Sequence, residues 1–538
     1  MLLDPINSIL LVTVLFTVFL LCKRRRLPLP PGPPKFPLLG NVFNHPSVSV
    51  WKVYMEWSKL YGKSSIPSPN ASPYSIGHFT DSDIIHVDIA GRSIVILSSL
   101  EAAVNLLDKR SAIYSDRPRL PMVNELMGWD SNFCMPVDTS FSRIRRRLFH
   151  SVFHAEASRE FRPEQLSTIH RLLLRLLHEP EDIMAHFRHM TGSLILGAAY
   201  GINVAATGDP YVKLAEEAVA SVTEALVPGR FLVDSLPLLK YIPSWFPGAG
   251  FQHFAREGKK LSQNLLEKPF AEAKRKIESG NAPYSFTAAS LQNLEEFPDK
   301  EQAIKDTAAV MYGAGTDTIV SALGTFVLAM FYNPEAQRKA QAEIDSVIKQ
   351  GHLPDFDDEP YLPHQCQKSD AYVSALVREV LRWQPVTPLG VAHFIVVEDE
   401  YKGYRIPRGS TVMTNTWAIL HDKNLYPDPY AFKPERFLLN GKLNPATQGP
   451  EAAAFGFGRR ICPGRHMAAS SIWITITSIL ATFDITKAVG KDGELVEPSY
   501  EYFERLVVVP RPFECSIKPR SKDAQALIQS TADQDCTT

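Results

Sequence analysis

The stretch at residues 455–464 constrains this chain more than any other. It reads Phe-Gly-Phe-Gly-Arg-Arg-Ile-Cys-Pro-Gly and places one cysteine, Cys462, in a glycine-rich loop. A helix-compatible run follows from Met467, so Cys462 should precede a helix N-terminus, where the dipole and free N–H groups favour thiolate over thiol. The glycines let the backbone approach a flat ligand, and Arg460 offers a forked donor for a carboxylate. The stretch predicts a thiolate presented to a metal-bearing disc with acidic substituents.

Taken alone, Cys462 would more often be an ordinary buried cysteine. Its companions reverse that expectation, because the stretch matches Phe-x-x-Gly-x-Arg-x-Cys-x-Gly, the haem-binding signature of the cytochromes P450. The chain resembles this family, whose haem iron is held by a cysteine thiolate. The resemblance implies haem b as cofactor and a P450 fold, mainly α with small β-sheets. It makes Cys462 the axial iron ligand and assigns cofactor binding to Phe455, Gly458, Arg460, Cys462 and Gly464.

Composition narrows the alternatives. The 538 residues are 45% hydrophobic and 21% charged, which is typical of a globular chain. Lys and Arg (57) balance Asp and Glu (58), so nothing indicates a nucleic-acid partner. Six scattered cysteines without a Cys-x-x-Cys pair argue against a zinc site or a disulfide scaffold. No nucleotide-binding glycine motif is present, so electrons for a redox reaction must come from another protein.

The N-terminus predicts a membrane anchor. Residues 6–22 are uncharged and apolar, and as a helix they span about 25 Å, slightly short of a hydrocarbon core of roughly 30 Å. The basic cluster at 23–26 follows this run, opposite to the order in a signal peptide, which is the alternative interpretation. We therefore expect an uncleaved transmembrane helix within residues 1–22, with the rest of the chain cytosolic at the endoplasmic reticulum.

Four regions follow from this pattern. After the anchor (1–22), residues 23–41 are basic and proline-rich and should form a semi-rigid hinge. Residues 42–520 would be the haem-thiolate domain, and the polar residues 521–538 a disordered tail. The chain resembles fungal microsomal P450s of secondary metabolism, such as the O-methylsterigmatocystin oxidoreductase group. Residues 63–81 and 364–371 interrupt that resemblance, as surface-loop insertions or as retained intron sequence.

Local patterns place the main elements. Residues 83–96 alternate as a β-hairpin does, and residues 401–409 and 411–420 indicate short strands. Residues 299–332 predict one long helix that Asn333-Pro334 ends. Midway, residues 314–318 read Ala-Gly-Thr-Asp-Thr and resemble the P450 central-helix motif; a helix kink is the alternative. The small residues would let this helix approach a planar cofactor, and Asp317 with Thr318 would form a catalytic proton-delivery pair.

A basic helix at residues 141–148 raises a choice between two arginines. P450s usually carry Trp-x-x-x-Arg here, with the arginine on a haem propionate, whereas this chain has Phe141 or Ser142 in place of the tryptophan. Arg145 and Arg146 therefore both stay candidates, and a solvated or reductase-docking surface is the alternative. The resemblance adds His393 as a further propionate ligand.

A second set of charged residues resembles the Glu-Arg-Arg network of the family. Glu379 and Arg382 lie at i and i+3 of a helix, which alone would indicate a surface ion pair. Arg436 lies at the family's spacing for the third member. The resemblance gives these three a structural role.

Function follows from the resemblance. It implies a monooxygenase that uses O₂ and electrons from an NADPH–cytochrome P450 reductase, with cytochrome b5 as an additional donor. Cys462 would push electron density toward O₂, and Asp317 and Thr318 would relay protons. The substrate would be a small lipophilic terpenoid or aromatic molecule, bound by residues 118–133, 227–246, 310–314 and 386–391 and around Phe503. A reductase-independent isomerase or dehydratase and a non-catalytic haem protein are the alternatives.

Overall fold

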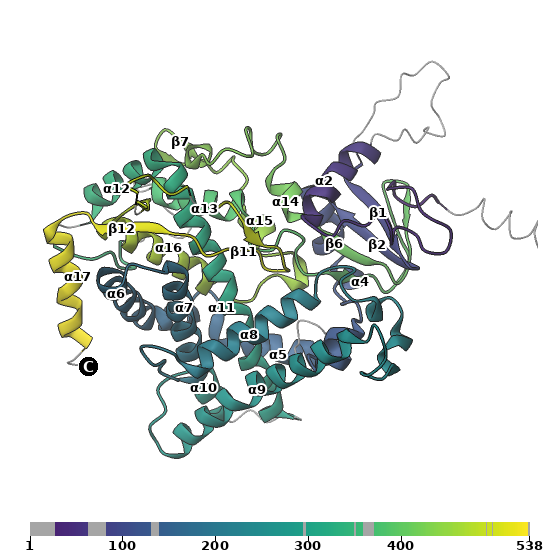
Figure 1. Ribbon diagram of the computed structural model, residues 1–538, viewed down its shortest axis with the longest axis horizontal. Helices are drawn as coiled ribbons and strands as arrows, with labels where there is room; N and C mark the ends of the chain where they lie inside the picture. The colour runs from purple at the N-terminus through teal and green to yellow at the C-terminus, as the bar shows by residue number, and fades with distance from the viewer. Residues whose placement is uncertain are drawn as a thin grey trace, which may run out of the picture.

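The chain folds into a broad helical part and a smaller part built on a β-sheet, side by side (Figure 1). The computed structural model describes residues 27–62, 82–130, 139–293, 297, 299–348, 351–358, 371–490, 492–497 and 499–535. The mainly helical class with small sheets, expected from the sequence, is confirmed. The anticipated anchor at 1–22, the basic cluster at 23–26 and the interruptions at 63–81 and 364–370 lie outside the described residues.

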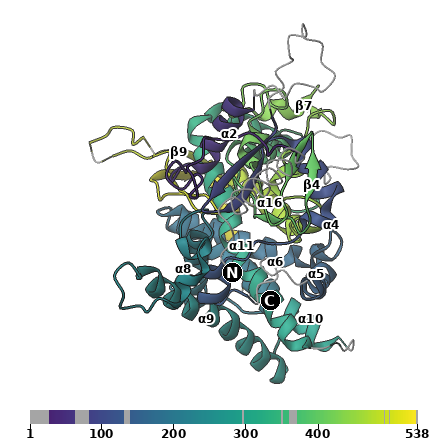
Figure 2. The same ribbon diagram turned by 90° about the vertical axis from the view of Figure 1, so that its right-hand side faces the viewer.

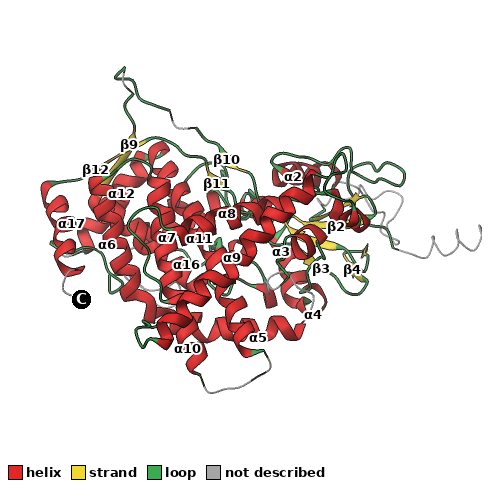
Figure 3. Cartoon of the chain, turned by 60° about the horizontal axis from the view of Figure 1, so that its bottom comes forward, coloured by secondary structure: helices red, strands yellow, loops and turns green. Residues whose placement is uncertain are grey.

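Helices of very different lengths make up most of the structure (Figure 3). In chain order they are α2 (Val50–Tyr61), α3 (Leu100–Ala103), α4 (Ser111–Tyr114), α5 (Thr139–Phe153), α6 (Arg162–His178), α7 (Ile183–Tyr200), α8 (Pro210–Ala225), α9 (Gly250–Glu278), α10 (Phe286–Gln292), α11 (Lys300–Tyr332), α12 (Pro334–Val347), α13 (Ala371–Trp383), α14 (Thr416–Leu420), α15 (Glu451–Ala454), α16 (Arg465–Thr482) and α17 (Lys522–Asp535).

The central helix is α11, which agrees closely with the predicted residues 299–332. It runs through the middle of the molecule and packs against α7, α8, α9 and α16 (Figure 2). It ends at Asn333 because Pro334 has no N–H to continue the ladder and starts α12 instead. Among the described helices α11 alone is apolar and long enough to cross a membrane, but 78% of its apolar window is buried. Its hydrophobicity is therefore that of a core helix.

The largest sheet has the strand order β1-β2-β6-β3. The predicted hairpin is confirmed: β1 and β2 pair antiparallel from Ile84 with Leu97 to Ile89 with Arg92. Ala90 and Gly91 form its turn with φ of 51° and 84°, the left-handed values that suit the twist of a two-residue hairpin loop. The strands are β1 (Ile84–Ile89), β2 (Arg92–Leu97), β3 (His393–Phe394) and β6 (Thr411–Thr414).

The remaining strands form two-stranded antiparallel pairs. These are β4 (Asp399–Tyr401) with β5 (Tyr404–Ile406), β7 (Leu438–Leu439) with β8 (Lys442–Leu443), β9 (Phe483–Lys487) with β12 (Cys515–Pro519), and β10 (Tyr502–Phe503) with β11 (Val509–Pro510). The predicted strand at 411–420 is wrong beyond Thr414. Asn415 accepts a hydrogen bond from the N–H of Ala418 at 3.0 Å and so caps the short helix α14.

The proline-rich segment is part of the folded unit and not only a hinge. The carbonyl of Pro28 accepts from the N–H of Arg405, and that of Pro31 from His86, each at 2.8 Å. Asn41 is fully buried, and its N–H donates to the carbonyl of Asp88. Because proline keeps its carbonyl acceptor, this run can pair along the free side of β1 although it cannot form a regular strand.

The prediction of a disordered tail at 521–538 is wrong for its described part. Lys522–Asp535 form α17, which packs beside α6 (Figure 1). Ser521 caps it by accepting from the N–H of Ala524 at 3.0 Å, and Ile528 is fully buried in the main core. The polar composition was misleading because a single narrow stripe of this helix is buried.

Candidate haem-thiolate site

The Cys462 loop connects α15 to α16. The N–H of Cys462 donates to the carbonyl of Phe455 at 2.8 Å, which closes the loop, and Arg465 donates to the carbonyl of Cys462 at 3.1 Å. α16 begins at Arg465, so Cys462 lies just before its first turn, as the sequence predicts. The thiol is half-buried. The loop therefore holds one thiol in a fixed backbone position while leaving it accessible.

Gly458 fixes how the loop packs. Its φ of 52° is left-handed, and a Cβ at this position would lie 2.3 Å from the carbonyl oxygen of Leu107. Leu107 belongs to a π-helical turn, Val104–Lys109, on which the loop rests. The closeness of the Leu107 carbonyl therefore explains why residue 458 is a glycine. From the sequence, we expected the glycine to let the backbone approach a flat ligand.

Two arginines lie directly at the loop. Arg146 of α5 donates from Nη2 to the carbonyl of Ile461, next to Cys462, at 2.8 Å. Arg460 donates from Nε to the carbonyl of Ser115 at 2.7 Å. A guanidinium carries five N–H groups and can therefore serve several acceptors at once. Both side chains are thus held where they could receive an acidic group of a ligand beside the thiol.

Arg117 joins this basic group, although no motif in the sequence points to it. It is 6% exposed and donates to the carbonyls of Val391 and Ala392 at 2.8 and 2.6 Å. The neighbouring Arg110 and Arg119 look the same in sequence but form salt bridges with Asp399 and Glu125. What distinguishes Arg117 is its tertiary position alone.

His393 is buried beside these arginines. Its Nδ1 lies 2.8 Å from the carbonyl of Tyr114 and must donate to it. Burial, followed by the nearby charge of Arg117, holds the pKa of His393 well below its ordinary value. The neutral ring then presents an unprotonated Nε2, which accepts hydrogen bonds and does not donate them. Arg117 and Arg460 are therefore better suited than His393 to bind a carboxylate.

Arg145, the other candidate on α5, is committed elsewhere. Its Nη2 and Nε donate to Oδ2 of Asp306 on α11 at 2.6 and 2.9 Å, and both side chains are almost fully buried. The ring of Phe141 lies 3.2 Å from the guanidinium carbon. Burial raises the pKa of Asp306, and the bond to Arg145 opposes that shift. The pair joins α5 to α11 and leaves Arg146 as the arginine of α5 that lies at the cysteine loop.

This division of roles is testable by replacing each arginine with methionine. Arg145→Met should lower the free energy of unfolding by about 3–5 kcal/mol, because Asp306 would stay buried without its partner. Arg146→Met should leave stability nearly unchanged and reduce haem retention. Urea unfolding and the haem-to-protein ratio after gel filtration measure the two effects. The opposite pattern would assign the cofactor role to Arg145.

The core helix α11 is accessible on one face at its midpoint. Ala314 is exposed and Thr318 half-buried, although most of the helix around them is buried. The hydroxyl of Thr318 donates to the carbonyl of Ala314 at 3.0 Å. Gly315 has a different role from the one predicted: a Cβ there would lie 2.8 Å from Ile195, so its small size serves packing on α7. Of the two small residues, Ala314 is the one that leaves the surface of the helix exposed.

Asp317 does not lie on the Thr318 face, because adjacent helical residues point about 100° apart. It lines a polar cavity together with Arg188 of α7, Glu216 of α8 and Arg505. Burial raises the pKa of Asp317, while Arg188 and Arg505 oppose the shift. The predicted acid–hydroxyl pair is therefore divided between two faces of α11.

The structure brings Glu379, Arg382 and Arg436 together. Glu379 and Arg382 are fully buried on α13, with Arg382 Nε 2.7 Å from Glu379 Oε2. Arg436 Nε reaches the same carboxylate at 3.1 Å. Both guanidinium groups also donate to backbone carbonyls within residues 420–431. The three side chains thus join α13 to the long irregular segment that leads to the Cys462 loop.

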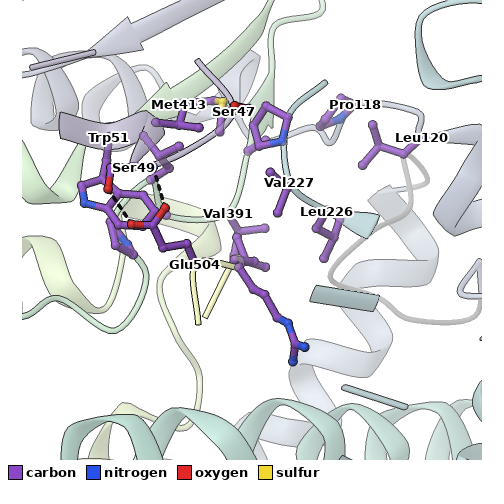
Figure 4. Close-up of a pocket in the computed structure, with 18 of the residues that line it drawn as sticks. Ser47, Ser49, Trp51, Pro118, Leu120, Leu226, Val227, Val391, Met413 and Glu504 are labelled. Atoms are coloured by element: carbon purple, nitrogen blue, oxygen red, sulfur yellow. Dashed lines mark hydrogen bonds between the residues drawn. The ribbon is translucent and has the colours of Figure 1, made fainter. Parts of the chain in front are cut away.

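A pocket opens between the start of α2 and the C-terminal loop (Figure 4). It combines residues from predicted substrate segments, including Pro118, Val227 and Val391, whereas residues 310–314 do not line it. At its edge Glu504 accepts from the N–H and the hydroxyl of Ser49 at 2.6 and 2.5 Å (Figure 4). The sequence did not predict the contribution of α2, because the two partners are 455 residues apart.

The site combines an accessible thiol, several arginines near it and a central helix that is exposed at Ala314. This donor set fits haem. A family model for cytochrome P450 matches residues 78–515. The chain belongs to the cytochrome P450 family and is a P450 monooxygenase, an oxidoreductase that binds haem b.

Fungal relatives extend the match over nearly the whole chain. Cytochrome P450 monooxygenase 98 of Postia placenta is 43% identical over 534 residues, covering 97% of both chains. Cytochrome P450 monooxygenase ple1 of Rhodocybe pseudopiperita is 42% identical, covering 94% of this chain and 92% of its own. Tryptamine 4-monooxygenase of Psilocybe cyanescens is 36% identical, covering 93% of this chain and 94% of its own.

Proposed function

We propose that this protein is a membrane-bound, reductase-dependent monooxygenase that hydroxylates a small lipophilic secondary metabolite. The observation that carries the proposal is the presence in one chain of the Cys462 loop and of an accessible Thr318 hydroxyl on an otherwise buried helix. A reductase-independent isomerase or dehydratase would not need a hydroxyl that delivers protons. A non-catalytic haem protein would need neither this hydroxyl nor a substrate pocket.

The residues around the loop would hold the cofactor. Cys462 would ligate the iron, and Arg146, Arg460 and Arg117 would bind the propionates, with His393 buried beside them. Bound haem supplies the activation of O₂, which a thiolate ligand favours. The chain contributes the orientation of the cofactor, the exclusion of bulk water and a supply of protons.

Thr318 and Asp317 are proposed to handle those protons. The Thr318 hydroxyl is held by the Ala314 carbonyl and lies on the accessible face of α11, where it can position a proton. Asp317, with its pKa raised by burial, takes up a proton closer to neutral pH than an ordinary aspartate does.

The pocket beside Ser49 and Glu504 is proposed as the substrate entrance. Its walls are mostly apolar, but its volume of about 70 Å³ is smaller than the roughly 300–1,000 Å³ of small-molecule sites. It is therefore better suited to passage than to residence. The tryptamine 4-monooxygenase relative supports an aromatic substrate, and the apolar walls also allow a terpenoid.

Exposed apolar side chains near this entrance support contact with a membrane. Large exposed patches of this kind mark interaction surfaces. Two segments carry them, and His45 of the first lies against Gly229, just before the second. Their members are Phe36, Leu38, Phe43, Val48, Leu232, Leu236, Leu238, Tyr241, Trp245 and Phe246. A lipophilic substrate could pass from the bilayer to the entrance between them, as expected for an enzyme of the endoplasmic reticulum membrane.

Three exposed arginines belong to the Cys462 loop or to the helix that reaches it. Arg459 lies within the loop, and Arg143 and Arg147 lie within one turn of Arg146, which bonds to Ile461. Complementary acidic groups on an NADPH–cytochrome P450 reductase, or on cytochrome b5, could dock on these arginines and shorten the electron path.

Co-expression with a fungal reductase and feeding of terpenoid and indole compounds tests the proposal. Wild-type protein should consume NADPH only with reductase and release a hydroxylated product. Thr318→Ala should lower product per NADPH by about tenfold while hydrogen peroxide rises, since proton delivery is lost. Thr316→Ala is the matched control, because its hydroxyl makes the same type of bond, to Tyr312, but is buried. Unchanged coupling in Thr318→Ala, or equal losses in both variants, would contradict the role of Thr318.

A further inference from the structure

A charged cavity of about 180 Å³ lies behind the catalytic face of α11. It is lined by residues of α7, α8, α11 and the loop between β10 and β11, which lie together in Figure 1. Four of its lining residues carry charge: Arg188, Glu216, Asp317 and Arg505. Two cations and two carboxylates thus surround one space, with Asp317 at its inner wall.

These four side chains do not pair directly with one another. In the part of the chain that the structure describes, none of them forms a salt bridge or a side-chain hydrogen bond, although Arg505 contacts the ring of Phe503. Partly buried charged groups need hydrogen-bond partners, and water is the partner that fits between them. A cavity of this volume has room for several water molecules.

We propose that this cavity conducts protons from solvent to Asp317, with Glu216 as the group that receives them and Arg188 and Arg505 as positioning residues. The inference rests on the proposed monooxygenase function. That reaction converts RH, O₂, NADPH and H⁺ into ROH, NADP⁺ and H₂O, so two protons accompany two electrons to the site. Each proton that Asp317 gives up must be replaced from solvent across the interior of the protein.

Glu216 is placed to begin that path. It lies on the outer helix α8, beside the exposed Lys213 and Glu217, and is less deeply buried than Asp317. The two carboxyl groups interact electrostatically, and Arg188 acts on both. Water between them supplies the hydrogen-bonded bridge that a proton needs to cross.

The electrostatics of the cavity keep both carboxyl groups able to gain and lose a proton. Burial raises the pKa of Glu216, and Asp317, Glu217 and Asp182 raise it further, whereas Arg188 opposes them. Arg188 and Arg505 likewise oppose the raised pKa of Asp317. Removing Arg188 should therefore raise the pKa of both carboxyl groups. The limb of the pH–rate profile that depends on their protonation should then move to higher pH.

The test compares Glu216→Gln with its neighbour Glu217→Gln in haem-loaded, full-length protein. Glu217 is exposed and outside the cavity, so it controls for the loss of one charge on α8. The measurement is reductase-supported NADPH and O₂ consumption, without added substrate, in H₂O and in D₂O. Glu216→Gln should slow consumption about tenfold, less than the loss of a direct general acid, and enlarge the solvent isotope effect. Glu217→Gln should change both much less, since it removes only the electrostatic effect of Glu217 on Glu216.

A second readout does not depend on turnover. A crystal structure of the wild-type protein should show ordered waters linking Glu216 to Asp317. A dry cavity, a direct Arg188–Asp317 ion pair that closes it, or equal rates in the two variants would overturn the proton path. Failure of the wild-type protein to consume NADPH with reductase would instead contradict the proposed function, so the two failures are distinguishable.

Discussion

Replacing Cys462 with alanine should abolish reductase-supported oxidation and remove the red-shifted absorption band of the ferrous–CO complex. The backbone N–H of Cys462 bonds to Phe455 and Gly458 packs the loop on Leu107, so the loop holds this thiol in a fixed place. Without the thiolate, the haem loses the ligand that favours O–O cleavage. We expect the rate to fall by at least about 10⁶-fold, the lower range of enzymatic rate accelerations.

Cys515 provides the matched control. It is also a free cysteine, but it lies on β12, where burial raises the pKa of its thiol to about 12. A protonated thiol of this kind is a poor metal ligand. Cys515→Ala should therefore keep both the band and the activity. A thiolate-type spectrum that survives in Cys462→Ala, or is lost in Cys515→Ala, would contradict the assignment of the iron ligand.

Glu379→Gln should cause a large loss of stability. This carboxylate is fully buried and accepts from Arg382 and Arg436, and it also accepts from the N–H of Lys433 at 2.7 Å. Its neutralisation leaves two guanidinium groups without their counter-charge in the protein interior. We expect a loss of about 3–5 kcal/mol in the free energy of unfolding, measured by urea titration. Because the network holds the segment before the Cys462 loop, haem retention should fall with it.

Glu335→Gln is the control for this variant. Glu335 and Arg338 have the same i, i+3 spacing on α12, but both are about two-thirds exposed. An exposed pair contributes only about 0–1 kcal/mol. A similar loss in both variants would show that helix spacing, and not burial, determines the effect. Such a result would contradict the structural role assigned to Glu379, Arg382 and Arg436.

Elements with a strong local pattern could be predicted from the sequence. The bounds of α11 were right because a long apolar run ends at Asn333 and Pro334, and the β1–β2 hairpin because alternation surrounds a tight turn. The loop around Cys462 was predictable because its chemistry lies within ten consecutive residues. Local order of this kind does not depend on distant partners.

The division of roles among the arginines could not be predicted. Arg145 and Arg146 are adjacent, and a rotation of about 100° around α5 sends one to Asp306 and the other to Ile461. Their partners lie 161 and 315 residues away in the chain. Asp317 is a similar case, because its companions Glu216 and Arg188 come from other helices. A sequence motif indicates which type of residue the site needs. Tertiary packing determines which of several such residues in the chain lies at the site.

The pairing of the proline-rich segment with β1 has a practical consequence for shortening this enzyme at its N-terminus. β1 is an edge of the large sheet, and residues 28–41 cover it through the bonds of Pro31 and Asn41. An uncovered strand edge is a template for aggregation. A truncation intended to remove the N-terminal apolar run should therefore end before Leu27, because a longer deletion would expose that edge to pairing with other chains.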